Sequence, residues 1–195
     1  MQKNKGYSSK TVKAYLKQVN ENFKHSSKKL NLNLIATPLG EMLSLSDQCF
    51  LYLLEFADKK NLVEEIKETA RRQSAFVVLG DTSINQRVRK QLREYFSGER
   101  KSFSLPLCKS GTPFQKSVWA VLQKIPAGET LSYQEVAARL GNAKLVRAVG
   151  SANRSNKLAL VIPCHRVIRA NGELGGYAGG VERKLKLLQL ERGGK

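Results

Sequence analysis

The sequence has few of the residues that mark disulfide-stabilised and metal-binding proteins. Its 195 residues include three cysteines, two histidines and one tryptophan. The three cysteines, Cys49, Cys108 and Cys164, are widely spaced, so we expect no disulfide framework and a reducing compartment. Because only His25 and His165 could supplement these thiols, we also expect no metal site.

Long apolar runs are also missing. No run approaches the about 20 residues that a membrane-spanning helix needs. Residues 1–5 have no apolar stretch behind them, so we expect no secretory signal. With 41% hydrophobic and 26% charged residues, the composition is that of a globular protein. It argues against membrane, secreted and disordered proteins.

Acidic residues are scarce. The sequence has 16 of them and 34 basic residues, which gives a net charge of +18. The excess is uneven: residues 1–31 carry net +7, residues 32–100 net 0 and residues 101–195 net +11. This asymmetry favours a polyanion, most simply nucleic acid, that meets one part of the chain. A merely solubilising surface is the alternative.

Three parts can be distinguished. Residues 1–31 form a basic extension, in which apolar residues between 12 and 23 recur at helical spacing. This extension is either a solvated tail or a functional arm. Residues 32–107 are predicted to form a small α+β domain without obvious chemistry, and residues 108–195 a basic, mainly helical domain.

In residues 32–107 we predict a turn at 37–40, strands at 42–46, 50–54 and 75–79, and two helices. Asn61 caps the first helix, and the second ends near Gly98.

The last part begins with a predicted helix over residues 114–122. Ser132 and Glu135 match a capping box that starts a second helix, and Gly141 ends it. A third helix is predicted from Leu145 to Asn153. Two short helices joined by a glycine-containing turn in a basic region indicate a helix-turn-helix, or a helical hairpin that binds nothing.

Cys164, His165 and Arg166 follow an apolar stretch, residues 158–162, that we predict to be a buried strand ended by Pro163. His165 could act as base toward the thiol, and Arg166 adds positive field. Neighbouring side chains of an extended chain point to opposite sides, so direct contact needs a local turn, or a water between them. A core thiol beside a surface histidine is the simpler interpretation of this pair alone.

Between residues 111 and 191 a series of motifs occurs in one order. These are Gly111–Gln115, Val118–Trp119, Ile125–Gly128, Ser132–Tyr133, Arg147–Gly150, Ala152–Asn153, Asn156, Ile162–Ile168, Gly172, Gly176–Gly180 and Lys184. The series closely resembles the O6-alkylguanine-DNA alkyltransferases, DNA-repair proteins that accept an alkyl group on a cysteine. The resemblance implies a small ribonuclease-H-like α/β N-terminal domain, then a mainly helical domain with a winged-helix-like helix-turn-helix.

The implied function is direct-reversal repair. The alkyl group of O6-alkylguanine, with O4-alkylthymine as a further candidate, passes irreversibly to Cys164 after the base is flipped out from the minor groove. His165 would be the general base, through a water, and Glu191 would orient it. Asn156 would tie the recognition helix to the active-site segment, and Tyr133 would donate to guanine N3.

The resemblance also implies how base and DNA are held. Carbonyls near Cys164 and Val167 would accept from the exocyclic amine, and the loop Tyr177–Gly179 would close over the base. Ala178 stands where some members carry serine, so a side-chain hydroxyl to O6 is absent, whereas a backbone donor from Ala178 or Gly179 remains. Arg147, Ala148, Gly150 and Arg154 would face the DNA, with Arg147 filling the vacated place in the stack.

Glu191 is predicted to lie on a helix with Val181, Leu185 and Leu188 inward. We expect no cofactor, and double-stranded DNA as partner of a monomer in the cytoplasm, nucleoid or nucleus; cooperative binding is left open. A binder that flags lesions without repairing them, a helix-turn-helix regulator and a cysteine hydrolase are the competing hypotheses.

Overall fold

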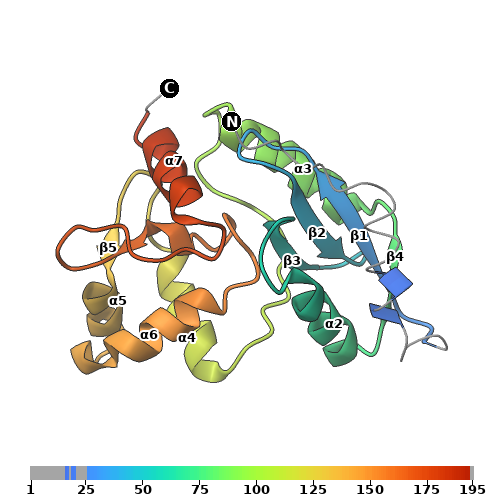
Figure 1. Cartoon of the computed structure of the whole chain (residues 1–195), viewed down its shortest axis with the longest axis horizontal. Coiled ribbons are helices and arrows are strands. Elements are labelled where there is room, and N and C mark those ends of the chain that lie inside the picture. The colour runs from blue at the N-terminus through green and yellow to red at the C-terminus, as the bar shows by residue number, and fades with distance from the viewer. Residues whose placement is uncertain (1–15, 18, 21–25, 194–195) are drawn as a thin grey trace. The chain divides into compact units, whose positions relative to one another are not determined.

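The structure, a computed structural model, describes residues 16, 17, 19, 20 and 26–193 (Figure 1). The helix predicted between residues 12 and 23 therefore lies largely outside the described residues. The chain divides into two compact units. The first holds the described residues up to Leu92 together with Leu105–Cys108, and the second holds Arg93–Ser104 and the described residues from Lys109 onward.

The first unit contains a four-stranded sheet. Its strands are β1 (Lys29–Ile35), β2 (Met42–Ser46), β3 (Leu51–Phe56) and β4 (Phe76–Leu79), in the order β3-β2-β1-β4. β1 runs parallel to β4, and the other neighbours are antiparallel. The predicted strands are confirmed with small shifts. However, residues 29–31, assigned to the extension from their charge, belong to β1.

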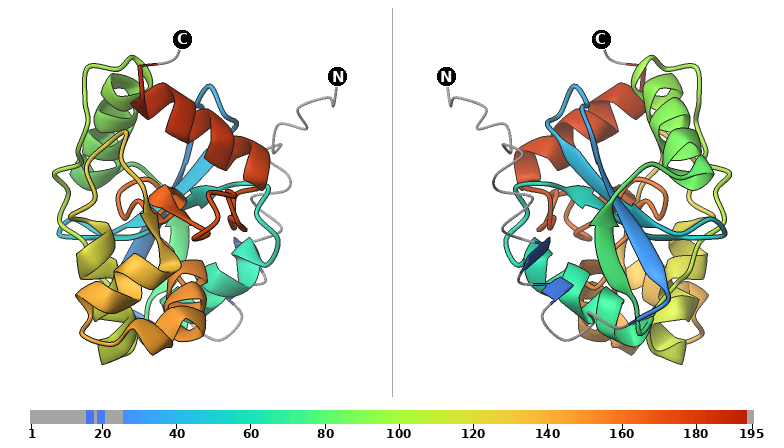
Figure 2. Two further views of the ribbon diagram at one scale, coloured as in Figure 1. Left: turned by 90° about the vertical axis from the view of Figure 1, so that its left-hand side faces the viewer. Right: turned by 90° about the vertical axis from the view of Figure 1, so that its right-hand side faces the viewer.

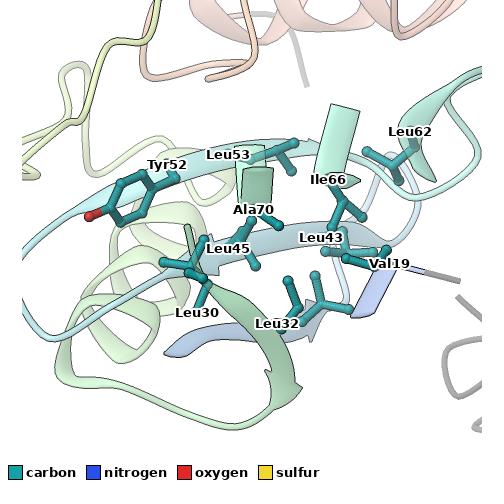
Figure 3. Packing of buried hydrophobic residues seen from close by; sticks show 12 residues of the cluster. Val19, Leu30, Leu32, Leu43, Leu45, Tyr52, Leu53, Leu62, Ile66 and Ala70 are labelled. Carbon is teal, nitrogen blue, oxygen red and sulfur yellow. The ribbon is translucent and has the colours of Figure 1, made fainter. Parts of the chain in front are cut away.

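The strands alternate between two buried faces. Leu30, Leu32, Leu43 and Leu45 point toward α2 (Leu62–Arg72), where Ile66 and other helix residues complete a hydrophobic cluster (Figure 3). Asn61 occupies the N-cap position, as predicted, but it has φ 69° and makes no capping hydrogen bond through its side chain.

The other face of β2 carries serines that contact α3 (Ser83–Phe96). The hydroxyls of Ser44 and Ser46 both donate to Asn85 Oδ1 over 2.9 Å, and all three residues are fully buried. Buried polar groups of this kind fix the register of helix on sheet, because every other arrangement leaves them unpaired. α3 ends before Gly98, which has φ +84°, and its last turn from Arg93 onward belongs to the second unit.

Part of the basic extension is attached to the first unit. Val19 is buried in the hydrophobic cluster. The side-chain amide of Asn20 donates to the carbonyl of Val77 and accepts from its amide, both over 2.7 Å. These bonds satisfy backbone groups of β4, the last strand of the sheet.

The second unit is mainly helical. Its elements are α4 (Pro113–Leu122), β5 (Leu131–Ser132), α5 (Tyr133–Arg139), η1 (Ala143–Leu145), α6 (Val146–Arg154), η2 (Cys164–Arg166), β6 (Val167–Ile168) and α7 (Val181–Glu191). α4, α5 and α6 pack on one another (Figure 2).

The predicted ends of α5 are confirmed. Ser132 Oγ accepts from the amide of Glu135, and the Glu135 carboxylate accepts from the amide of Ser132. Gly141, with φ +86°, follows the helix. α5, the turn and α6 thus have the element order of a helix-turn-helix. None of the described helices is long and apolar enough to span a membrane.

Residues 158–162 do not form the predicted strand. They are buried but turn sharply, with Leu160 at φ 68° and the amide of Ile162 bonded to the carbonyl of Leu158. A short apolar run indicates burial, but it cannot distinguish a buried strand from a buried turn. The turn leads the chain directly into η2.

The predicted inward face of α7 is wrong in part. Leu188 is buried, but Val181 and Leu185 are 48% and 43% exposed. Leu187 and Lys184 lie inward instead, each 0% exposed. The helix is rotated because the ammonium group of Lys184 has two carbonyl partners in the interior.

Candidate active site

Cys164 opens the single-turn helix η2 and is 6% exposed. The Asn156 amide nitrogen donates to Cys164 Sγ over 3.1 Å and to the carbonyl of Ile162 over 2.9 Å. Asn156 Oδ1 accepts from the amide of Leu158. Asn156 therefore holds the preceding turn and also places a donor on the sulfur, which favours the thiolate.

His165 is fully buried, and its Nε2 lies 2.9 Å from Glu191 Oε1. An ionised carboxylate can only accept, so Nε2 carries the proton and Nδ1 carries the lone pair. Nδ1 is buried and has no hydrogen-bond partner among the described residues. Burial lowers the pKa of His165, although Glu191 opposes the shift. His165 is thus a neutral imidazole with a free basic nitrogen, and not the surface histidine of the simpler interpretation.

Glu191 accepts from four groups. Arg166 reaches it with two nitrogens, at 2.9 Å and 2.8 Å, the Tyr95 hydroxyl donates to Oε1 over 2.7 Å, and the amide of Gly128 donates to Oε2 over 3.3 Å. His165 is the fourth. Burial alone raises the pKa of Glu191, but the hydrogen bonds from His165 and Arg166 outweigh it and hold the pKa well below its usual value.

Lys184 is fully buried and donates to the carbonyls of Val167 and Leu174. Burial lowers its pKa to about 8, with Cys164 acting in the opposite direction. Lys184 joins β6 to the loop that follows it. The carbonyl of Val167 accepts from Lys184, and that of Cys164 accepts from the side-chain amide of Asn153 and from the backbone amide of Val167.

The side chain of Tyr133, the first residue of α5, lies close to two glycines that are distant in the sequence, Gly150 and Gly175. A Cβ on Gly150 would lie 4.0 Å from its ring, and one on Gly175 would lie 3.6 Å from its hydroxyl. Burial, and then the nearby Cys164, raise the pKa of Tyr133, so its hydroxyl stays protonated and can donate. The Tyr177 ring lies edge-on to His165, 6.4 Å between centroids.

The predicted DNA-facing residues share one side of α6. Arg147, Ala148 and Arg154 are exposed and Gly150 is half-buried. Val149, Ala152 and Asn153 form the inner side. Ala152 is close-packed, because the Trp119 indole donates to its carbonyl over 2.8 Å. In the loop after β6, Ala178 is exposed and Gly179 is buried.

The structure thus joins Asn156 to Cys164 and Glu191 to His165 through direct hydrogen bonds, with Cys164 and His165 adjacent in η2, and it places Arg147 and Arg154 on the exposed side of α6. Sequence reasoning missed three residues of this cluster. Tyr95 lies in the segment that was thought to carry no chemistry, Arg166 was expected only to add positive field, and Lys184 had no expected role. The available signals were helical spacings: Tyr95 lies three residues after Leu92, and Lys184 lies four residues before Leu188.

No group of three or more His, Cys, Asp or Glu side chains in the described part of the chain is placed to hold a metal ion.

Two family models match the chain. The 6-O-methylguanine DNA methyltransferase ribonuclease-like domain matches residues 30–108, and the DNA binding domain of the same family matches residues 113–193. The constitutive methylated-DNA–protein-cysteine methyltransferase of Bacillus subtilis is 45% identical over 164 residues, covering 80% of this chain and 92% of the relative. The corresponding protein of Methanosarcina acetivorans is 43% identical over 155 residues, 80% and 94% of the two chains.

Solved structures similar to this chain come from the same family. The Mycobacterium tuberculosis O6-methylguanine methyltransferase has a TM-score of 0.72 at 36% identity and covers 85% of this chain and 94% of its own. Mycobacterium tuberculosis OGT in complex with DNA has a TM-score of 0.71 at 36% identity, over 85% and 93% of the two chains. With both parts of the chain matched, each over nearly its whole length, the protein belongs to the 6-O-methylguanine DNA methyltransferase family.

Proposed function

We propose that this protein repairs alkylated DNA by direct reversal, taking the alkyl group of O6-alkylguanine onto Cys164 in a single, irreversible turnover. The observation that carries the proposal is a buried thiol with an amide donor on its sulfur, next to a neutral histidine whose proton is fixed on the nitrogen facing a carboxylate. Relatives that match most of this chain are methylated-DNA–protein-cysteine methyltransferases.

The proton and electron balance of the reaction is simple. The thiol proton passes to His165 Nδ1, by way of a water. The sulfur then forms a bond to the alkyl carbon as the bond from that carbon to O6 breaks. The electron pair goes to the guanine, and Tyr133 donates a proton or a hydrogen bond to N3, which stabilises the developing charge. The proton held by His165 returns through solvent to the guanine or to Tyr133, so that the products are a thioether and neutral guanine. The thioether has no good leaving group, so the protein is consumed.

The remaining residues hold the base. The carbonyls near Cys164 and Val167 would accept from the exocyclic amine of guanine. The loop Tyr177–Gly179 covers the base, with a backbone donor from Ala178 or Gly179 to O6. Flipping delivers the base to this pocket, since the reacting carbon is out of reach inside a stacked duplex.

The arrangement requires that Cys164→Ala abolish transfer and leave DNA binding intact. The thiol is the acceptor, whereas the exposed side of α6 holds the DNA. Transfer is measured as loss of label from an oligonucleotide with one O6-methylguanine, and binding by fluorescence anisotropy. Cys49→Ala and Cys108→Ala are the matched controls and should transfer at the wild-type rate. Transfer that survives in Cys164→Ala would assign the acceptor to another residue.

Arg147 and Arg154 are expected to differ in their effects although both are exposed on α6. If Arg147 fills the place of the flipped base, Arg147→Ala slows transfer more from a duplex than from a single strand, where no pair is broken. If Arg154 meets phosphates, Arg154→Ala weakens binding at every sequence and lowers the salt slope by about 1. Equal effects of Arg147→Ala on both substrates would remove its role in flipping.

The proposed partner is double-stranded DNA, and the proposed place of action is wherever the host keeps its DNA, in cytoplasm, nucleoid or nucleus. We propose a monomer as the active unit, because one chain carries the thiol, the base and the carboxylate. A non-enzymatic lesion binder would keep the DNA affinity but gain no mass, which separates it from the proposed enzyme.

A further inference from the structure

Tyr95 is buried, 2% exposed, in the last turn of α3. Its ring contacts Phe96 edge-on and Phe103 at a tilt, both with centroids 5.3 Å away. Its hydroxyl donates to Glu191 Oε1 over 2.7 Å. A buried tyrosine usually finds some partner for its hydroxyl, but here the partner is the carboxylate that holds His165.

The oxygen that Tyr95 contacts is the one that His165 contacts. Glu191 Oε1 accepts from Tyr95, His165 and Arg166, whereas Oε2 accepts from Arg166 and the amide of Gly128. A donor on Oε1 draws negative charge away from the position that faces the imidazole. It also restricts the rotation of the carboxylate, together with Arg166 and the amide of Gly128.

We propose that Tyr95 is a positioning residue for alkyl transfer: its hydroxyl holds Glu191 so that Oε1 keeps the proton of His165 on Nε2 and leaves Nδ1 as the base. The inference rests on the proposed function, because it deepens the role of the His165–Glu191 pair. It assigns a role in the reaction to the part of the chain in which the sequence indicated only structure.

The effect of Tyr95 on the pKa of His165 depends on the other charged and titratable groups around the His165–Glu191 pair. Glu191 and Lys184 approach His165 from α7, Arg166 follows it in η2, and the ring of Tyr177 lies against it. Burial and Glu191 raise the pKa of Tyr95, so its hydroxyl remains a neutral donor. Tyr95→Phe therefore removes one donor from Oε1 without adding or removing a charge.

Loss of this donor leaves more negative charge on Oε1, which stabilises the imidazolium form of His165. We expect Tyr95→Phe to raise the pKa of His165 by about 0.5 to 1 unit. The chain has two histidines, so a His25→Gln background leaves one imidazole, and its ¹⁵N resonances report both titration and tautomer. The acid limb of the pH–rate profile for transfer should move to higher pH by the same amount.

Phe103→Leu is the matched control. It removes a ring contact of Tyr95 and keeps the hydroxyl, so it should lower thermal stability while His165 titrates as in the wild type. A purely structural role of Tyr95 predicts the same behaviour for both variants.

An unchanged or lowered pKa of His165 in folded Tyr95→Phe would overturn the inference. If Tyr95→Phe does not fold, Tyr95→Gln provides a neutral hydrogen-bond donor at this position and adds no imidazole. It should then restore the wild-type tautomer of His165, and failure to do so would also overturn it. The NMR titration needs no DNA. A wild-type protein that transfers no alkyl group would overturn the proposed function and leave the coupling of Tyr95 to His165 measurable.

Discussion

Replacing Glu191 by Gln is expected to slow alkyl transfer by roughly 100-fold or more and to lower the free energy of unfolding by about 3–5 kcal/mol. The variant leaves buried Arg166 without its carboxylate. The amide can also donate to His165, which would allow the proton to sit on Nδ1, the nitrogen required as base. Single-turnover kinetics and chemical denaturation measure the two effects.

The same variant should change the acid sensitivity of the fold. The pKa of Glu191 is held below its ordinary value in the folded protein, so its contribution to stability is present above the unfolded-state pKa of 4.5. That contribution is lost as the pH falls toward the folded-state value. The pKa of His165 is also lowered, so its contribution is present above the unfolded-state value of 6.5 and is lost as the pH falls further. Glu191→Gln should therefore flatten the decline of stability below about pH 4.5, which is the part that Glu191 carries.

Glu173→Gln is the control for this prediction, because Glu173 is an exposed carboxylate paired with Arg169. It should change neither the transfer rate nor the acid profile, since exposed pairs contribute little. Transfer at the wild-type rate by Glu191→Gln would show that the carboxylate does not set the tautomer of His165.

Asn156→Ala is expected to slow transfer by roughly 10- to 100-fold, the effect of losing a hydrogen bond of about 1.5–3 kcal/mol to a charged group. The amide is the donor on Cys164 Sγ and also holds the turn before it. We expect the reaction of Cys164 with iodoacetamide, measured without DNA in a Cys49→Ser, Cys108→Ser background, to slow in parallel.

Asn153→Ala is the control that separates the two roles of Asn156, which are to donate to the sulfur and to hold the backbone. Asn153 donates to the Cys164 carbonyl and not to its sulfur. The variant should lose stability but keep a reactive thiol. Equal loss of thiol reactivity in both variants would mean that Asn156 acts by holding the backbone and not through the sulfur.

Helix and strand positions could be predicted well where a local signal was strong. Ser132 and Glu135 specify the start of α5 through their own hydrogen bonds, and Gly141 specifies its end through a positive φ. The strand at residues 42–46 followed from alternating apolar and polar residues. These are interactions between near neighbours in the chain, so the sequence contains them directly.

The errors arose where hydrogen bonds from polar side chains to backbone groups decide the structure. Residues 158–162 turn because Asn156 binds Leu158 and Ile162. α7 is rotated because Lys184 finds carbonyl partners across the unit. The spacing of apolar residues does not reveal hydrogen-bond partners of this kind. It therefore predicted that Val181 and Leu185 are buried, although both are exposed.

In the candidate site, too, some residues could be predicted from the sequence and others could be found only in the folded structure. Cys164 and His165 were found because they are adjacent, and the resemblance supplied Glu191, Asn156 and Tyr133. Tyr95 belongs to a segment that resembles the family only in general pattern, and its partner Glu191 is 96 positions away. Its contact with the carboxylate could only be seen in three dimensions.

The most direct test of the account is the intact mass of the wild-type protein after incubation with an excess of duplex that carries one O6-methylguanine, followed by peptide mapping. The account predicts a gain of one methylene unit that stops at one equivalent and maps to Cys164. A mass gain at Cys49 or Cys108, or repeated turnover without any gain, would contradict it.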